Sequence, residues 1–142
     1  MTTTPITPAL TPATPRRRGV TVTLWTAQIL LAAGFAAMAA SKLLGDPSQV
    51  AGFQAIGFGQ WFRYLTGACE LGGAIGLLIP RLSGLAAYGL VGVMIGATLT
   101  NLFLIPGMAP VAIMTVVLGA VFATIGWARR QEVRALLGTF AR

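Results

Sequence analysis

The chain has 142 residues, of which 56% are apolar and only 9% are charged, whereas about 25% of the residues of a soluble domain are charged. A soluble core of this size cannot bury so much apolar surface, so the composition excludes an ordinary soluble domain and predicts an integral membrane protein. The net charge of +7 does not indicate a nucleic-acid partner, because the positive residues stand at the ends of apolar segments, where membrane proteins keep their cytoplasmic anchors.

The usual ligands of metals and redox cofactors are scarce. The single cysteine, Cys69, excludes an internal disulfide, a Cys-x-x-Cys dithiol and a four-cysteine metal site, and in apolar surroundings its thiol is expected to be inert. Because the sequence has no histidine, ligation of haem or zinc by imidazole is excluded too. We therefore expect no metal site, no cofactor and no enzyme activity of this chain alone.

The chain begins with residues 1–15, a segment of threonine and proline without apolar periodicity. Proline favours extended conformations over helix. Three consecutive arginines, residues 16–18, then mark the cytoplasmic edge. We expect residues 1–19 to form a disordered basic cytoplasmic tail.

Residues 20–44 are almost all apolar or small and exceed the roughly 20 helical residues that cross a bilayer, so they predict a first transmembrane helix. The alternative is a cleaved signal peptide, since Ala37-Met38-Ala39 imitates a cleavage site. The length of the apolar segment and the further spans argue for a helix that is retained.

Three more spans follow in the hydropathy pattern. Residues 45–60 contain Asp46-Pro47 and several glycines, which predict the longest loop. The second span is expected at 61–80, with aromatic residues at its start that suit a membrane interface. A turn then leads to the third span at 82–105, and a Pro-Gly reversal leads to the fourth at 111–127.

Four spans place both termini on one side of the membrane. Eight of the ten positive residues lie with the termini or in the turn between the second and third spans, and only Lys42 and Arg63 lie on the other side. The four spans predict an all-α bundle of four transmembrane helices over residues 20–128, surrounded by the lipid bilayer, and the charge asymmetry predicts that both termini lie in the cytoplasm.

Residues 129–142 form a short basic tail. Apolar residues recur at helical spacing at Val133, Leu136, Leu137 and Phe140, while Arg130 and Arg134 occupy other positions. This pattern predicts an amphipathic helix on the inner leaflet. The alternative is a frayed chain end.

Glu70 is the one acidic residue in the middle of a predicted span. A charge there costs about 2.5–3.5 kcal/mol, which the apolar residues of the same helix barely offset, so Glu70 should face protein rather than lipid. Such a carboxyl is a functional candidate. The alternative, which we leave open, is a structural carboxyl that fixes helix register.

Few polar residues can approach Glu70, and together they make the predicted intramembrane polar site. Lys42 at the end of the first span is the expected ionic partner, although it can also extend to the headgroups. Arg63 lies two helical turns away and is expected to extend to the outer interface, and Thr66 is within hydrogen-bonding reach at i−4. Asn101, on the third span beside Thr98 and Thr100, reaches a similar depth.

Small residues are dense on the second and third spans and predict close helix packing. The positions concerned are Gly67, Gly72, Gly73, Gly76, Gly92 and Gly96, of which Gly72/Gly76 and Gly92/Gly96 have GxxxG spacing. We expect packing within the chain rather than dimerisation.

The segment TGACELGGAIGLLIPR resembles the DoxX-like family of small bacterial membrane proteins. Among the residues that match the family's pattern are Thr66, Gly67, Glu70, Pro80 and Arg81. The resemblance extends over residues 53–103 and the AASKLLG end of the first span. It implies a four-helix membrane bundle and association with quinone-linked or thiol-stress redox complexes.

Three functions therefore stand as hypotheses. The first is a non-catalytic membrane subunit that anchors or supports a partner oxidoreductase, with the site around Glu70 holding the bundle together or meeting a ligand such as a quinone. The second is a small proton-coupled transporter that uses Glu70. The third is an assembly factor for other membrane proteins.

Overall fold

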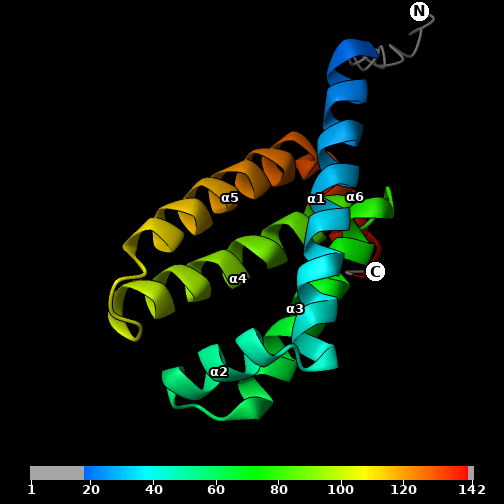
Figure 1. Cartoon of the computed structure of the whole chain (residues 1–142). Helices are drawn as coiled ribbons and strands as arrows, with labels where there is room; N and C mark the ends of the chain where they lie inside the picture. The colour runs from blue at the N-terminus through cyan, green and yellow to red at the C-terminus, as the bar shows by residue number, and fades with distance from the viewer. Residues whose placement is uncertain (1–17, 141–142) are drawn as a thin grey trace, which may run out of the picture.

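The computed structural model describes residues 18–140, and every regular element in that range is a helix. The six helices are α1 (Arg18–Leu44), α2 (Pro47–Ile56), α3 (Gln60–Leu78), α4 (Ser83–Phe103), α5 (Ala109–Ala128) and α6 (Arg130–Phe140) (Figure 1). The all-α prediction is confirmed. The tail expected at the amino end lies almost wholly outside the described residues.

Three helices are long and apolar enough to cross a membrane, namely Gly19–Leu44 within α1, α4 and α5. Helix α3 has 19 residues, which at 1.5 Å per residue extend about 28 Å and suffice for a hydrocarbon core. It is less apolar than the others because it carries Arg63 and Glu70. Length and composition therefore support three membrane spans. Whether α3 is a fourth depends on whether Arg63 and Glu70 face protein or lipid.

The helices pack as two antiparallel pairs joined through α3. Helix α3 contacts α1 on one side and α4 on the other, while α4 pairs along its length with α5. In Figure 1 the hairpin of α4 and α5 leans away from α1. Phe35 of α1 still meets Phe122 of α5 edge to face, with 5.0 Å between ring centroids. The core therefore closes the bundle near its middle, and the helices diverge towards the α4–α5 turn.

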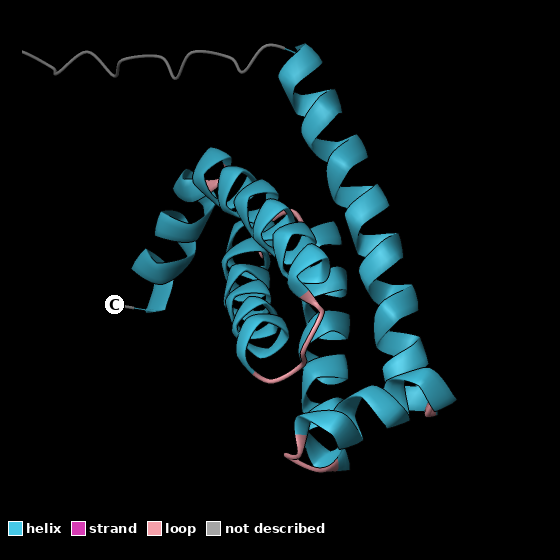
Figure 2. Cartoon of the chain, turned by 60° about the vertical axis from the view of Figure 1, so that its left-hand side comes forward, coloured by secondary structure: helices cyan, strands magenta, loops and turns pink. Residues whose placement is uncertain are grey.

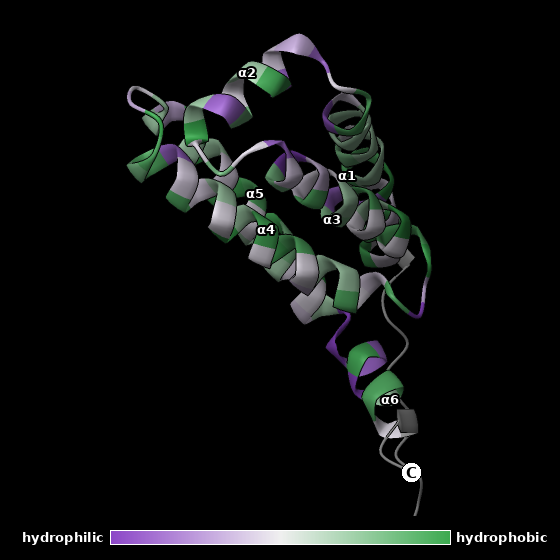
Figure 3. Cartoon of the chain, turned by 90° about the horizontal axis from the view of Figure 1, so that it is seen from below, coloured by the Kyte–Doolittle hydropathy of each residue, from purple (hydrophilic) through white to green (hydrophobic). Residues whose placement is uncertain are grey.

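Much of the outer surface is apolar. Leu30, Phe103 and Ile113 are 68%, 78% and 67% exposed, and Figure 3 shows hydrophobic residues along α4 and α5, with hydrophilic residues gathered on α2 and around the start of α6. Large apolar surfaces of this extent mark contact with lipid or a partner. Together with the long apolar helices, they identify a membrane protein.

The predicted loop over residues 45–60 is wrong, because most of it is the helix α2, which crosses the adjoining ends of α1 and α3 (Figure 2). Its supposed breakers are caps. Asp46 accepts a hydrogen bond from the backbone N–H of Ser48, Pro47 stands in the first turn, and Gly57 ends the helix in the left-handed conformation at φ 85°. The hydrogen bonds from Ser48 also lower the pKa of the exposed Asp46 carboxyl.

Three of the six glycines at which close packing was predicted lie against a neighbouring helix. A side chain at Gly67 would lie 3.1 Å from Leu43, one at Gly73 would lie 2.5 Å from Leu90, and one at Gly76 would lie 2.7 Å from the Ala86 Cβ. At the other three positions a Cβ would meet nothing within 4 Å: Gly72, Gly92 and Gly96. In the Gly72/Gly76 pair only Gly76 lies against another helix of the chain, and in the Gly92/Gly96 pair neither glycine does.

Candidate functional site

One face of α3 is buried along its length although it carries two charges. Its buried members recur at intervals of three and four residues: Arg63, Gly67, Glu70, Ala74 and Leu77. This spacing places them on one side of the helix. The face packs against α1 and α4, so the charges of α3 point into the protein and not towards lipid.

The structure contains the ion pair that the sequence predicts between Lys42 and Glu70. The Lys42 Nζ lies 2.8 Å from Oε1 and 2.7 Å from Oε2 of Glu70, and the two side chains are only 10% and 5% exposed. The alternative in which Lys42 extends to the headgroups is therefore wrong. Gly67 permits the pairing, because a Cβ there would come within 3.2 Å of the Lys42 Cβ. The two helices thus approach closely enough for the ammonium to reach the carboxylate.

Arg63 does not extend to the outer interface, contrary to prediction, and is 3% exposed. Its Nε donates to the Gln60 side chain at 2.7 Å, its guanidinium stacks on Tyr64 at 4.2 Å, and Gln60 in turn donates to the Val50 carbonyl of α2. Helix α2, which the sequence analysis did not foresee, covers this end of the bundle. The buried Arg63 Nη1 has no hydrogen-bond partner among the described residues.

The hydrogen bond predicted between Thr66 and Glu70 is absent. The Thr66 hydroxyl lies 3.0 Å from the carbonyl oxygens of Phe62 and Arg63, to which it donates within its own helix. Threonine commonly satisfies itself this way inside a helix. Within residues 18–140, Lys42 is therefore the only residue that forms hydrogen bonds with the Glu70 carboxylate.

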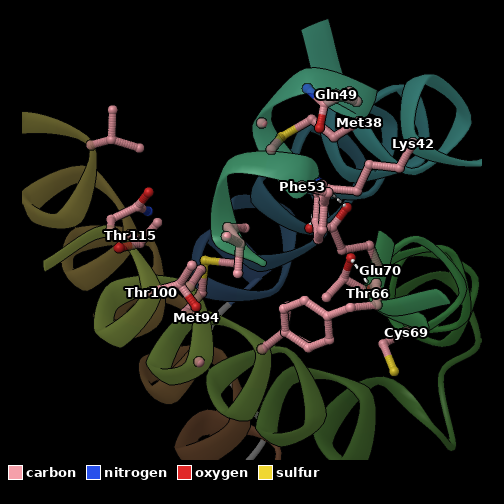
Figure 4. A pocket seen from close by; sticks show the side chains of 18 of the residues that line it. Met38, Lys42, Gln49, Phe53, Thr66, Cys69, Glu70, Met94, Thr100 and Thr115 are labelled. Atoms are coloured by element: carbon pink, nitrogen blue, oxygen red, sulfur yellow. Dashed lines mark hydrogen bonds and ion pairs between the residues drawn. The ribbon is translucent and has the colours of Figure 1, made fainter. Parts of the chain in front are cut away.

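A pocket of about 640 Å³ opens beside the ion pair, between α2 and α3 on one side and α4 and α5 on the other. Lys42 and Glu70 form part of its wall, and Phe53 of α2 projects into it, as Figure 4 shows. Gly92 and Gly96 line the α4 side, where the absence of side chains widens the space. The divergence of the α4–α5 hairpin thus creates the pocket, and the polar pair lies in its deeper wall.

The wall opposite the ion pair carries uncharged polar groups. Thr100, Asn101 and Thr115 line this side. Thr115 is engaged with Thr98 at 2.7 Å, whereas the Asn101 amide makes no hydrogen bond to any described residue. Asn101 therefore shares the pocket with Glu70, as its predicted depth suggested, but does not touch it.

Cys69 also lines the pocket and is exposed. In Figure 4 its sulfur points away from Glu70, in keeping with the turn of about 100° between adjacent helical residues. The thiol of Cys69 and the carboxylate of Glu70 therefore do not face each other in the pocket.

A second buried polar cluster, near the carboxyl end of α3, was not predicted from the sequence. Arg129 donates to the Gln28 side-chain oxygen at 2.6 Å and to Glu132 at 2.9 Å, and Glu132 also accepts a hydrogen bond from Ser83. Gln28 is fully buried and donates to the Leu77 carbonyl. The cluster joins α1, α3, α4 and the start of α6. Glutamine in an apolar segment and arginine beside a predicted interface were weak signals for it.

The size and lining of the pocket suit the binding of a small molecule. No group of three potential metal-ligating acids, cysteines or histidines occurs in the described part of the chain. The pocket volume lies within the roughly 300–1,000 Å³ of small-molecule sites, and an apolar wall with a few placed polar groups is their usual construction. A lipophilic molecule with a polar head fits this combination best.

The sequence model of the DoxX-like family matches residues 26–125, which is more than half of the chain and contains Lys42, Glu70 and Asn101. No curated protein and no solved structure matches the chain.

Proposed function

We propose that this chain, which belongs to the DoxX-like family, is a non-catalytic membrane subunit whose pocket holds a lipophilic molecule for a membrane-associated redox complex. The family membership makes it a membrane protein, and its sequence lacks histidine and a second cysteine with which to hold a redox centre. Its contribution is therefore to bind and position, while a partner supplies the chemistry.

The pocket beside Lys42 and Glu70 is the observation that carries this proposal. A bundle that needed only to anchor a partner would gain stability by closing α4 and α5 onto α1 and filling that space with side chains. The chain instead keeps glycines at 92 and 96 on the pocket wall and retains a costly ion pair there. Both features favour a ligand over simple anchoring.

The proposed topology has four spans, with both termini on the cytoplasmic side of a bacterial inner membrane. Its support is that the buried face of α3 removes Arg63 and Glu70 from lipid, so the hydropathy of this helix understates its capacity to span. The exposed Arg81 then lies on the cytoplasmic side with Arg130 and Arg134 of α6, as the bias of positive residues requires.

A pocket-filling variant tests the proposal. Gly96→Leu places a side chain in the pocket without touching the ion pair, and Gly72→Leu places the same side chain on α3 at a position with open space around it. Membranes with wild-type protein or Gly72→Leu are expected to retain a co-purifying oxidoreductase activity. Gly96→Leu should lose the activity while keeping the assembled complex. Unchanged activity in folded Gly96→Leu, or no associated oxidoreductase at all, would refute the proposal.

A proton-coupled transporter is the second candidate, and the position of Glu70 on a pocket wall favours it. Such a carrier needs a carboxylate that alternates between a proton and the ligand, whereas Glu70 is held by Lys42 at both oxygens. Substrate-driven proton flux in liposomes that disappears in Glu70→Gln would establish transport. Absence of flux in wild-type liposomes would exclude it for the substrate tested.

A further inference from the structure

The buried charges around the pocket do not balance. Lys42 and Glu70 neutralise each other, but Arg63 adds a second buried cation on the same face of α3. Among the described residues the only ion pairs are Lys42 with Glu70 and Arg129 with Glu132. No carboxylate therefore forms an ion pair with Arg63. The third acid of the sequence, Asp46, is exposed and caps the first turn of α2. The group keeps one positive charge in excess.

Part of this excess is offset by the end of α1. A side chain at Gly45, directly after the last residue of α1, would lie 4.0 Å from both terminal nitrogens of Arg63. The carboxyl end of a helix carries a partial negative charge of about half a unit. The unpartnered Nη1 shows that the carbonyl groups of this helix end do not satisfy the guanidinium fully.

Lys42 is the cation of this group that lines the pocket. An ammonium has three N–H donors, and the two contacts with the Glu70 oxygens account for two of them. The third donor belongs to a side chain that lines the pocket, and the amide of Asn101 lies free on the opposite wall. Arg63 itself does not line the pocket, so it acts on a ligand through its field.

From this imbalance we infer that the pocket binds a lipophilic carboxylate, a single-chain molecule with one negative charge, whose head group accepts a hydrogen bond from Lys42. The inference rests on the proposed function and narrows its ligand. A bound monoanion brings the sum over Lys42, Arg63, Glu70 and ligand to zero. The chain of the ligand then lies along the apolar wall formed by Phe53, Gly92 and Gly96.

The same charges discriminate against other ligands. A lipophilic cation would meet a site that already has one positive charge too many, and the carboxylate that should attract it is occupied by Lys42. A neutral carbonyl head group, such as that of a quinone, can accept a hydrogen bond from Lys42 but does not neutralise the excess positive charge. A carboxylate is therefore expected to bind more tightly than a neutral head group with the same chain.

Binding of three matched fluorescent probes tests this order. The probes are a dansylated undecanoate, its methyl ester and the corresponding alkylammonium, titrated at pH 8.5 into the full chain in a non-ionic detergent. Gly96→Leu, with its pocket filled, measures partition into the micelle. One charge-assisted hydrogen bond in place of a neutral one should make the acid bind about 10- to 100-fold more tightly than the ester, and the ammonium should not bind above the Gly96→Leu background.

Substitution of the pair locates the head group. The paired variant Lys42→Met/Glu70→Leu removes the donor together with its carboxylate, so neither partner of the pair is left buried alone and the fold is expected to be kept. Its preference for acid over ester should fall to less than about threefold, because only the field of Arg63 remains. An undiminished preference in this variant would overturn the assignment of Lys42.

Failure of the inference differs from failure of the proposed function. Equal or tighter binding of the ester, measured above the Gly96→Leu background, overturns the carboxylate and leaves a ligand pocket in place. Tightest binding of the ammonium overturns the carboxylate and favours the transporter candidate. If none of the three probes binds above that background, both the inference and the pocket as a binding site for such ligands fail.

Discussion

Breaking the ion pair between Lys42 and Glu70 one side at a time should destabilise the protein strongly, whereas replacing both partners should not. Glu70→Leu leaves an ammonium and Lys42→Met leaves a carboxylate, each at a position where the native side chain is 10% exposed or less. Loss of one partner of a buried pair typically costs about 3–5 kcal/mol of unfolding free energy. Apolar replacement of both partners is usually neutral or stabilising by about 1–4 kcal/mol.

The two single variants and the double variant form a thermodynamic cycle. Unfolding free energies come from reversible titration with sodium dodecyl sulfate in mixed micelles, followed by circular dichroism. The expected coupling energy between the two substitutions exceeds about 3 kcal/mol. Each single variant leaves one buried charge without its partner, and the second substitution removes that charge. If the free-energy changes of the two single variants sum to that of the double variant within about 0.5 kcal/mol, Lys42 and Glu70 do not interact energetically, and the charge balance proposed for the pocket is wrong.

The double variant also separates a structural pair from a functional one. If it folds as well as the wild type and loses the activity of the partner complex, Lys42 and Glu70 serve a ligand. If it folds and keeps that activity, the pair only fixes helix register, which is the alternative that the sequence left open.

Three further perturbations test other contacts. Gly76→Ala should cost about 1–3 kcal/mol in the same titration, since its Cβ would lie 2.7 Å from another Cβ, while Gly72→Ala, with open space, should be neutral or slightly stabilising. Arg129→Met should cost about 2 kcal/mol and speed amide exchange of α6, because it breaks a partly buried ion pair and a buried hydrogen bond, whereas Arg130→Met should change stability by less than about 0.5 kcal/mol. The lowered pKa of Asp46, below its ordinary 3.8, means that its cap stabilises α2 above that pH and is lost as the pH falls through the lowered value. Intrinsically corrected amide exchange of α2 should therefore accelerate in acid for the wild type and stay constant for Asp46→Asn.

Hydropathy and helix periodicity were sufficient to predict the helical class and the ends of the long helices to within a few residues. The predicted second span at 61–80 appears as α3 at Gln60–Leu78, and the fourth, at 111–127, appears as α5 at Ala109–Ala128. The short α2 was missed because proline and glycine mark helix ends as well as loops. Only the capping geometry of Asp46 and Gly57 distinguishes the two cases.

The ion pair was predictable because a buried carboxyl in a span requires a partner and the sequence offers few cations. The burial of Arg63 was not predictable, because it depends on α2 lying across the end of the bundle. The cluster of Gln28, Arg129 and Glu132 joins residues about one hundred positions apart, which no local pattern reveals. The pocket likewise arises from the angle between helix pairs rather than from any single segment.

Whether α3 crosses the membrane is the most direct test of the account. In a Cys69→Ser background, single cysteines at Ser48 in α2 and at Arg81 after α3 are labelled in intact spheroplasts with a maleimide that cannot cross membranes. The account predicts labelling of Ser48→Cys from outside and of Arg81→Cys only after permeabilisation. Labelling of both from the same side would show that α3, with Arg63 and Glu70, does not span the bilayer, and would contradict an intramembrane site.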